Sequence, residues 1–117
     1  MLEYDMDQLM KEMAAGEQHS REFIECATQF LTGYMRYKKW VEKYSDRFRN
    51  AGGTEKASYD LCIKFIDMFR SIRYDGLKHP VVVEKGSSYT LYDGWHRTLI
   101  MRVLGKKRIP YVERNKK

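Results

Sequence analysis

The spacing of the hydrophobic positions divides the chain into two parts. In the first part apolar residues recur at every third or fourth position, which predicts amphipathic helices. The first predicted helix is short and stops near Gly16. Its apolar positions are Leu2, Met6, Leu9, Met10 and Met13.

The second predicted helix is long. Ser20 is a residue type that commonly caps a helix start, and an apolar stripe follows it at close to the helical period. We expect Gly33 to kink this helix. The stripe is rich in aromatic residues and methionine, which favours a core face or a face for a partner helix. It consists of Phe23, Ile24, Ala27, Phe30, Leu31, Tyr34, Met35, Val41, Tyr44 and Phe48.

A glycine-rich break at residues 50–54 separates these helices from the rest of the chain. After the break the spacing predicts another amphipathic helix over residues 56–73, and Asp75-Gly76 is typical of a helix end. Its apolar positions are Leu61, Phe65, Met68, Phe69 and Ile72.

The pattern then becomes one of short strands. Residues 80–84 are a β-branched run, residues 86–88 a turn and residues 88–92 a second strand, so a hairpin is predicted. A helix over residues 95–104 follows and stops at Gly105. A third strand is predicted over residues 109–113, where Pro110 indicates the start of a strand or a sheet edge.

This order of elements predicts an α+β fold. We expect a helical extension over residues 1–52, followed over residues 53–117 by a small mixed sheet with a helix packed on it. The two parts are expected to pack together as one compact unit.

Composition narrows the class of protein. A hydrophobic content of 43% suffices for a core, and the net charge of +6 favours anionic partners such as nucleotides or nucleic acid. No apolar run reaches the length of a membrane span and the first residues are acidic, so we expect a cytoplasmic protein with no membrane partner. Cys26 and Cys62 fall on or near helical stripes and are expected to be buried, reduced thiols.

The candidate chemistry lies where the second strand of the hairpin meets the following helix. Asp93-Gly94 forms this junction, and His96 and Arg97 fall in the first turn of the helix. Backbone N–H groups at a helix start attract anions, and nearby cationic side chains strengthen the attraction. The corner is therefore predicted to bind a phosphate group.

Each residue of the corner has a structural alternative. An arginine fork matches phosphate oxygens, but Arg97 also has Asp93 and Glu113 as possible ion-pair partners. His96 either donates to a phosphate oxygen or packs under the loop. Trp95 either stacks on a base or belongs to the core. Asp93 is a tentative catalytic or magnesium-binding carboxylate, with capping of the helix as its alternative role. Gly94 allows a tight backbone approach or a positive φ.

From about Phe65 to Val112 the sequence resembles the ParB/sulfiredoxin-like superfamily. The stretch Phe69-Arg-Ser-Ile-Arg-Tyr-Asp-Gly-Leu-Lys-His-Pro-Val-Val-Val83 is similar to its helix end and proline-led strand. Tyr89-Thr-Leu-Tyr-Asp-Gly-Trp-His-Arg97 is similar to its strand and phosphate loop, and Leu104-Gly105 with Ile109-Pro110 to its next helix exit and strand.

The resemblance implies a nucleotide, ATP or CTP with magnesium, or another phosphate, bound at Gly94, His96 and Arg97. It also implies that Lys78 and His79 lie near the same cleft, with Lys78 as a phosphate contact. In sulfiredoxins the residue before the His-Arg pair is the reactive cysteine. Here it is Trp95, so sulfinic acid repair is excluded. We also expect neither a complete partition protein nor its CTP clamp cycle.

Three functions are compatible with this sequence. The first is a nucleotide-binding domain, as an NTPase or phosphotransferase if catalytic, in which Asp75 or Glu84 assists Asp93. The second is a DNA-binding or DNase module that grips a backbone phosphate with the same corner and extends the contact along the basic C-terminal strand. The third is a non-catalytic interaction protein, such as a phage or mobile-element accessory protein, that binds a protein partner or self-associates through the helical half.

Overall fold

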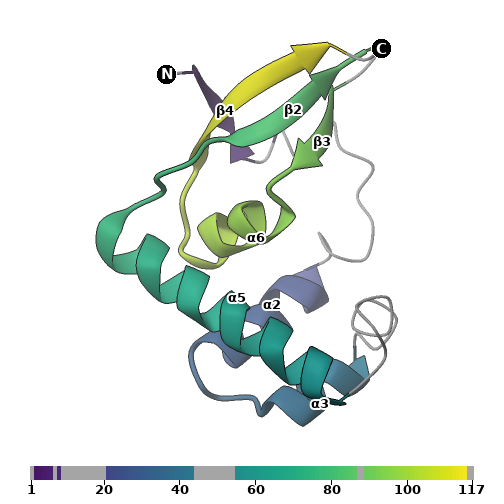
Figure 1. Cartoon of the computed structure of the whole chain (residues 1–117). Helices are drawn as coiled ribbons and strands as arrows, with labels where there is room; N and C mark the ends of the chain where they lie inside the picture. The colour runs from purple at the N-terminus through teal and green to yellow at the C-terminus, as the bar shows by residue number, and fades with distance from the viewer. Residues whose placement is uncertain (1, 7, 9–20, 44–54, 87–88, 116–117) are drawn as a thin grey trace.

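The computed structural model describes residues 2–6, 8, 21–43, 55–86 and 89–115 (Figure 1). They form an α+β fold, as predicted. The elements are β1 (Leu2–Asp5), α2 (Arg21–Leu31), α3 (Tyr37–Lys43), α5 (Glu55–Asp75), β2 (Val81–Lys85), β3 (Tyr89–Asp93), α6 (Trp95–Val103) and β4 (Arg108–Asn115).

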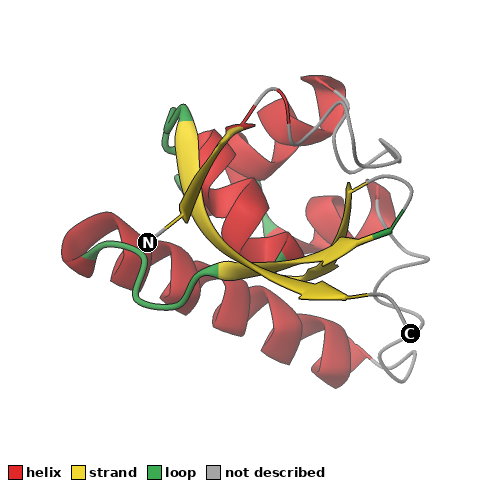
Figure 2. Ribbon diagram, turned by 90° about the horizontal axis from the view of Figure 1, so that it is seen from above, coloured by secondary structure: helices red, strands yellow, loops and turns green. Residues whose placement is uncertain are grey.

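The four strands make one mixed sheet in the order β1-β4-β2-β3. The β4 strand is antiparallel to β1 and parallel to β2, and β2 is antiparallel to β3. The labelled helices all lie on one side of this sheet (Figures 1 and 2). Of these, α6 packs against β2 and also against α2 and α5, so it forms the layer between the sheet and the other helices.

The core fills the space on both sides of α6. Val81, Val83 and Ile109 on the inner face of the sheet are fully buried, as is Ile100 of α6. On the far side of α6, aromatic rings from three helices pack together, with the Phe30 and Trp40 ring centroids 5.2 Å apart. Burial of this apolar surface is the main term that stabilises the fold.

The prediction of a helix from Leu2 is wrong over residues 2–5, which form β1. Apolar and polar residues alternate from Leu2 to Met6, and this period of two fits a strand. Pairing with β4 favours the strand over the helix, because β1 supplies hydrogen-bond partners for the backbone groups along the edge of β4 that does not face β2. Met6 follows β1 and is fully buried. Met6 and Gln8 are helical, as predicted, and the other residues of that predicted helix lie outside the described residues.

The long second helix is in fact two helices. Residues 32–36 interrupt it, and Gly33 has φ +87°, which ends α2 rather than kinking it. Two successive N–H groups, those of Tyr34 and Met35, both bond to the carbonyl oxygen of Gln29. The side chain of Tyr34 is 86% exposed, so its predicted place on the apolar stripe is wrong. Ser20, Tyr44 and Phe48 lie outside the described residues.

The elements around the candidate site are confirmed. Helix α5 covers the predicted 56–73 with slightly longer ends, the hairpin is formed by β2 and β3, and α6 begins at Trp95. Gly76 and Gly105 follow α5 and α6 with φ +80° and +75°, as expected of glycines just after a helix end.

The third predicted strand, β4, lies inside the sheet and not at its edge. Pro110 is tolerated there because of its register. The Met6 N–H donates to Lys107 O, so Met6 and Lys107 form a hydrogen-bonded pair of the β1–β4 ladder. Hydrogen-bonded and non-hydrogen-bonded pairs alternate along an antiparallel ladder, so Pro110 and Glu3 form a non-hydrogen-bonded pair. Pairing of β4 with β2 begins only at Tyr111. The missing N–H of Pro110 therefore costs no ladder hydrogen bond.

Candidate functional site

The junction between β3 and α6 is built on Gly94. This glycine is the N-cap residue of α6, with φ 109° and ψ 28°, and no side chain caps the helix start. The capping role predicted for Asp93 is therefore wrong. The carbonyl oxygen of Gly94 accepts hydrogen bonds from both the N–H and the buried hydroxyl of Thr98, at 2.8 and 2.9 Å, which fix the first turn.

A β-bulge precedes the junction. In the β2–β3 pair Val83 lies opposite Leu91, whereas Val82 lies opposite Asp93, so Tyr92 is the additional residue. A bulge shifts the residues that follow it and often re-aims a side chain near a site. Here it places Asp93, rather than Tyr92, at the end of the ladder beside α6.

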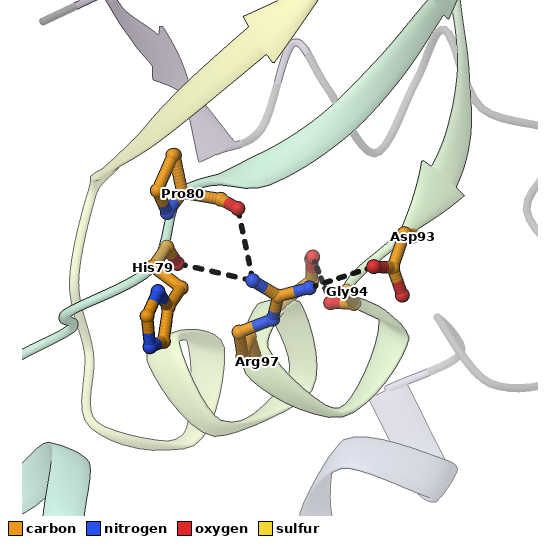
Figure 3. A network of polar contacts seen from close by, with 6 residues as sticks. His79, Pro80, Asp93, Gly94 and Arg97 are labelled. Carbon is orange, nitrogen blue, oxygen red and sulfur yellow. Dashed lines mark hydrogen bonds and ion pairs between the residues drawn. The ribbon is translucent and has the colours of Figure 1, made fainter.

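Arg97 ties this junction to the segment that leads into β2 (Figure 3). Its Nη1 donates to the carbonyl oxygens of His79 and Pro80, at 3.2 and 2.9 Å. Its Nη2 lies 3.2 Å from Asp93 Oδ2, and only 19% of the arginine side chain is exposed. Of the two predicted ion-pair partners, Asp93 is the one that Arg97 contacts. The guanidinium group thus connects residues before β2 with the end of β3.

His96 and Trp95 are both half-buried. The imidazole of His96 meets the ring of Phe65 edge-on, with centroids 5.1 Å apart, so its packing against α5 agrees with the structural alternative. Trp95 packs against the edge of the core. Both residues nevertheless border a cavity, so packing and ligand contact are compatible for each.

Two cavities adjoin the junction. The smaller has a volume of about 250 Å³ and the larger of about 520 Å³, and both are lined by Met68 of α5 and by Arg97. The smaller is completed by Asp93, Gly94, Trp95 and His96. The larger is completed by Ser71, Ile72, Gly76, Leu77, Lys78 and His79. We refer to the two together as the α5–α6 cleft.

The cleft brings together all seven residues that the sequence singled out. Lys78 and His79 line the larger cavity, as the resemblance implied, and the other five line the smaller one. The additional carboxylates considered for catalysis are not part of it. Asp75 lines neither cavity, and Glu84 lines neither and is paired with Arg114 at 3.7 Å.

The apolar wall of the cleft was not predicted as part of a site. Met68, Ile72 and Leu77 line the larger cavity, and Met68 is 37% exposed. In the sequence Met68 and Ile72 appear as ordinary members of an apolar helical stripe. Only the placement of the last turns of α5 beside α6 turns them toward an open space.

The predicted magnesium site rests on Asp93. Within the described parts of the chain, no group of three or more His, Cys, Asp or Glu side chains is placed to hold a metal ion. Asp93 is the carboxylate on the cleft wall, and 67% of its side chain is exposed. A magnesium ion here would take further oxygens from phosphate and water, which is how Mg²⁺ is commonly bound beside nucleotides.

The two cysteines are buried, as predicted. Burial raises the pKa of the Cys62 thiol to about 11. The thiolate form is therefore scarce at neutral pH, which argues against a nucleophilic role for this residue.

Comparison with family models, with curated proteins and with solved structures finds no match to this chain. Among the described helices, none combines the length and the hydropathy needed to cross a membrane.

Proposed function

We propose that the α5–α6 cleft binds a phosphate-bearing ligand of the nucleotide class. The observation that carries the proposal is that two unlike cavities share Met68 and Arg97 in their linings. The smaller ends at the start of α6, where the backbone favours an anion. The larger is walled by apolar side chains and suits a flat ring. The resemblance to the ParB/sulfiredoxin-like superfamily supports the same class of ligand.

The dimensions support this class. Pockets for small ligands usually span about 300–1,000 Å³ and combine apolar walls with a few polar groups. The larger cavity has a volume of about 520 Å³, and Lys78 and His79 are among the residues that line it. Both residues are exposed. In this proposal they contact a phosphate chain that leaves the smaller cavity.

Arg97 has two roles in this proposal. Its Nη1 stays with the carbonyl oxygens of His79 and Pro80 and holds the cleft together. Its Nη2 contacts the phosphate, which competes with the carboxylate of Asp93 for this group. Because Asp93 is largely exposed, that ion pair is worth only about 0–1 kcal/mol, and a phosphate that also meets the helix start can displace it. The released carboxylate is then placed to hold Mg²⁺ against the phosphates.

The proposed function is binding of the ligand. If the protein is also an enzyme, the reaction that we propose is that of an NTPase or a phosphotransferase. Such a reaction needs a metal that bridges phosphate oxygens and a group that orients the attacking oxygen. Asp93 is the candidate for the first requirement.

The DNA-binding alternative loses part of its support. It relied on the basic C-terminal strand, but Arg108 lies 3.3 Å from Glu3 and Arg114 lies 3.7 Å from Glu84. These carboxylates offset the charge that would attract a nucleic-acid backbone along β4.

Thermal shift with ATP, CTP, GTP, inorganic phosphate and a short DNA duplex, each with and without Mg²⁺, tests the proposal. A nucleotide at 100 times its dissociation constant adds about 2.7 kcal/mol of stability, which raises the melting temperature by several degrees. Lys78→Glu is expected to abolish this shift. The matched control is Lys64→Glu, an exposed lysine of α5 that lines neither cavity.

Two results would contradict the proposal. One is the absence of a shift with every nucleotide at millimolar concentration. The other is an equal loss of the shift in both lysine variants, which would indicate a general charge effect. A shift with the duplex alone, lost at higher salt, would favour the DNA-binding alternative.

A further inference from the structure

The turn between α2 and α3, together with α3 itself, holds half of the net charge of the chain. Residues 34–43 contain four cationic residues and one carboxylate, which gives +3 out of a total of +6. The five charged residues are Arg36, Lys38, Lys39, Lys43 and Glu42. A surface segment with such an excess of positive charge attracts anions.

The cations of this segment are available to a partner. Arg36, Lys38 and Lys39 are exposed, and their side chains make no ion pair or hydrogen bond within the described part of the chain. The arginines of β4 differ, because Arg108 and Arg114 each lie beside a carboxylate. The field of the α3 segment is therefore not offset by contacts of this kind.

Aromatic rings lie among these cations. Tyr34, in the turn, is 86% exposed, so its ring takes no part in the core. Tyr37 stands in the sequence between two of the cations and meets Tyr59 of α5 edge-on, with ring centroids 5.2 Å apart. Tyr59 is itself 45% exposed. Asp60 follows Tyr59 in the sequence and lowers the charge of the region by one, from +3 to +2, so the region stays positive.

We infer that this surface binds single-stranded nucleic acid. We call it the tyrosine–lysine patch, and it consists of Tyr34, Arg36, Lys38, Lys39 and Tyr59. Its cations contact backbone phosphates, and its exposed rings stack on unpaired bases, which is how proteins commonly hold single strands. In a duplex the bases stack on one another, so the rings gain nothing from it.

A protein partner fits the patch less well. Protein interfaces usually have a buried centre that is depleted in charged residues. The exposed residues over 34–42 other than Tyr34 are all charged. The patch therefore lacks such a centre.

The patch is separate from the nucleotide cleft. Tyr59 precedes Met68 of the cleft by nine residues of α5, which is about 14 Å along the helix axis. Helix α3 lies at the end of the molecule away from the sheet (Figure 1). The inference is thus independent of the proposed function, and it does not use the strand β4.

The number of cations predicts how binding depends on salt. Each phosphate contact with a single strand contributes about −0.7 to the slope of log K against log salt concentration, so three cations give a slope of about −2. We expect a dissociation constant of roughly 1–100 μM, as is usual for binding without sequence specificity.

Fluorescence anisotropy of a labelled twelve-nucleotide thymidine strand, titrated with protein between 50 and 300 mM NaCl, tests the inference. The double variant Lys38→Gln/Lys39→Gln removes two phosphate contacts, so its slope is expected to be about −0.7. The matched control is Lys106→Gln/Lys107→Gln, which changes another pair of adjacent exposed lysines outside the patch. It is expected to keep the slope of the native chain.

The rings are tested separately. Tyr34→Ala removes one stacking ring and is expected to raise the dissociation constant at least about fivefold. Tyr74→Ala is the control, because Tyr74 is 79% exposed and lies at the other end of α5, and it is expected to bind like the native chain. Circular dichroism and thermal melting establish that all the variants are folded.

Three results would overturn the inference. The first is no binding of the strand by 500 μM native protein in 50 mM salt. The second is an equal change of slope in the two lysine pairs, which would indicate a general effect of charge. The third is a duplex of the same length that binds as tightly as the single strand, together with unchanged binding by Tyr34→Ala.

Discussion

Gly94 and Val81 approach each other so closely that there is no space for a side chain between them. A Cβ atom built on Gly94 would lie 2.6 Å from Val81 Cγ1 and 2.9 Å from Val81 Cβ. Val81 begins β2 and is fully buried, so it has no room to move away. The junction between β3 and α6 therefore requires glycine for two reasons: a side chain would clash with Val81, and the backbone has φ +109°.

Gly94→Ala is expected to lower the free energy of unfolding by about 2–5 kcal/mol, because backbone strain and overpacking add. Gly105→Ala is the control, since Gly105 has φ +75° but no atom within 4 Å of the added methyl group. It should lose only about 1–2 kcal/mol from the left-handed conformation. Urea denaturation measures both. Equal losses in the two variants would contradict the close contact with Val81.

The hydroxyl of Thr98 gives a second test of the junction. Thr98→Val keeps the shape and removes the buried hydrogen bond to Gly94 O, so a loss of about 0.5–1.5 kcal/mol is expected. The loss stays small because that oxygen keeps its bond to the Thr98 N–H. Thr98→Ser retains the hydroxyl and serves as the control for the bond. If the valine variant is as stable as the native chain by urea denaturation, the hydroxyl does not support the turn.

Local signals made this half of the molecule predictable. The alternation in residues 88–92, the glycine at 94 and the helical period from Trp95 are all contained within a few residues, and β3, the junction and α6 formed where they indicated. The seven predicted site residues consequently line one cleft.

Long-range contacts account for the error at residues 2–5 and for the features of the site that were not predicted. Residues 2–5 carry both a helical and an alternating pattern, and their partner, β4, lies at the other end of the chain, with Leu2 opposite Tyr111. The acceptors of Arg97 Nη1 are main-chain carbonyl oxygens, which have no signature in a sequence. Met68 faces a cavity only because α5 crosses beside the start of α6. These features follow from tertiary placement.

Substitutions of Arg97 test whether the charge or the forked shape of its guanidinium group stabilises the fold. Arg97→Ala removes two hydrogen bonds and the contact with Asp93. The free energy of unfolding is expected to fall by about 2–4 kcal/mol, because hydrogen bonds to charged groups are worth more than neutral ones. Arg97→Lys keeps the charge but not the fork, so it should recover less than half of the loss. Asp93→Asn should cost less than about 1 kcal/mol, since that carboxylate is largely exposed. An asparagine variant as unstable as Arg97→Ala in urea would show that the ion pair, and not the two carbonyl contacts, holds the segment.

Cys62 is expected to make the stability of the fold depend on pH in the alkaline range. Its pKa in the folded chain is raised from 9.0 to about 11 by burial, so folding favours the neutral thiol. Its contribution to stability is complete below pH 9 and is lost as the pH rises toward 11. Thermal melting of Cys62→Ala should therefore depend less on pH across that interval than melting of the native chain. Parallel profiles for the native chain and Cys62→Ala would show that the thiol of Cys62 ionises as easily in the folded chain as in the unfolded one.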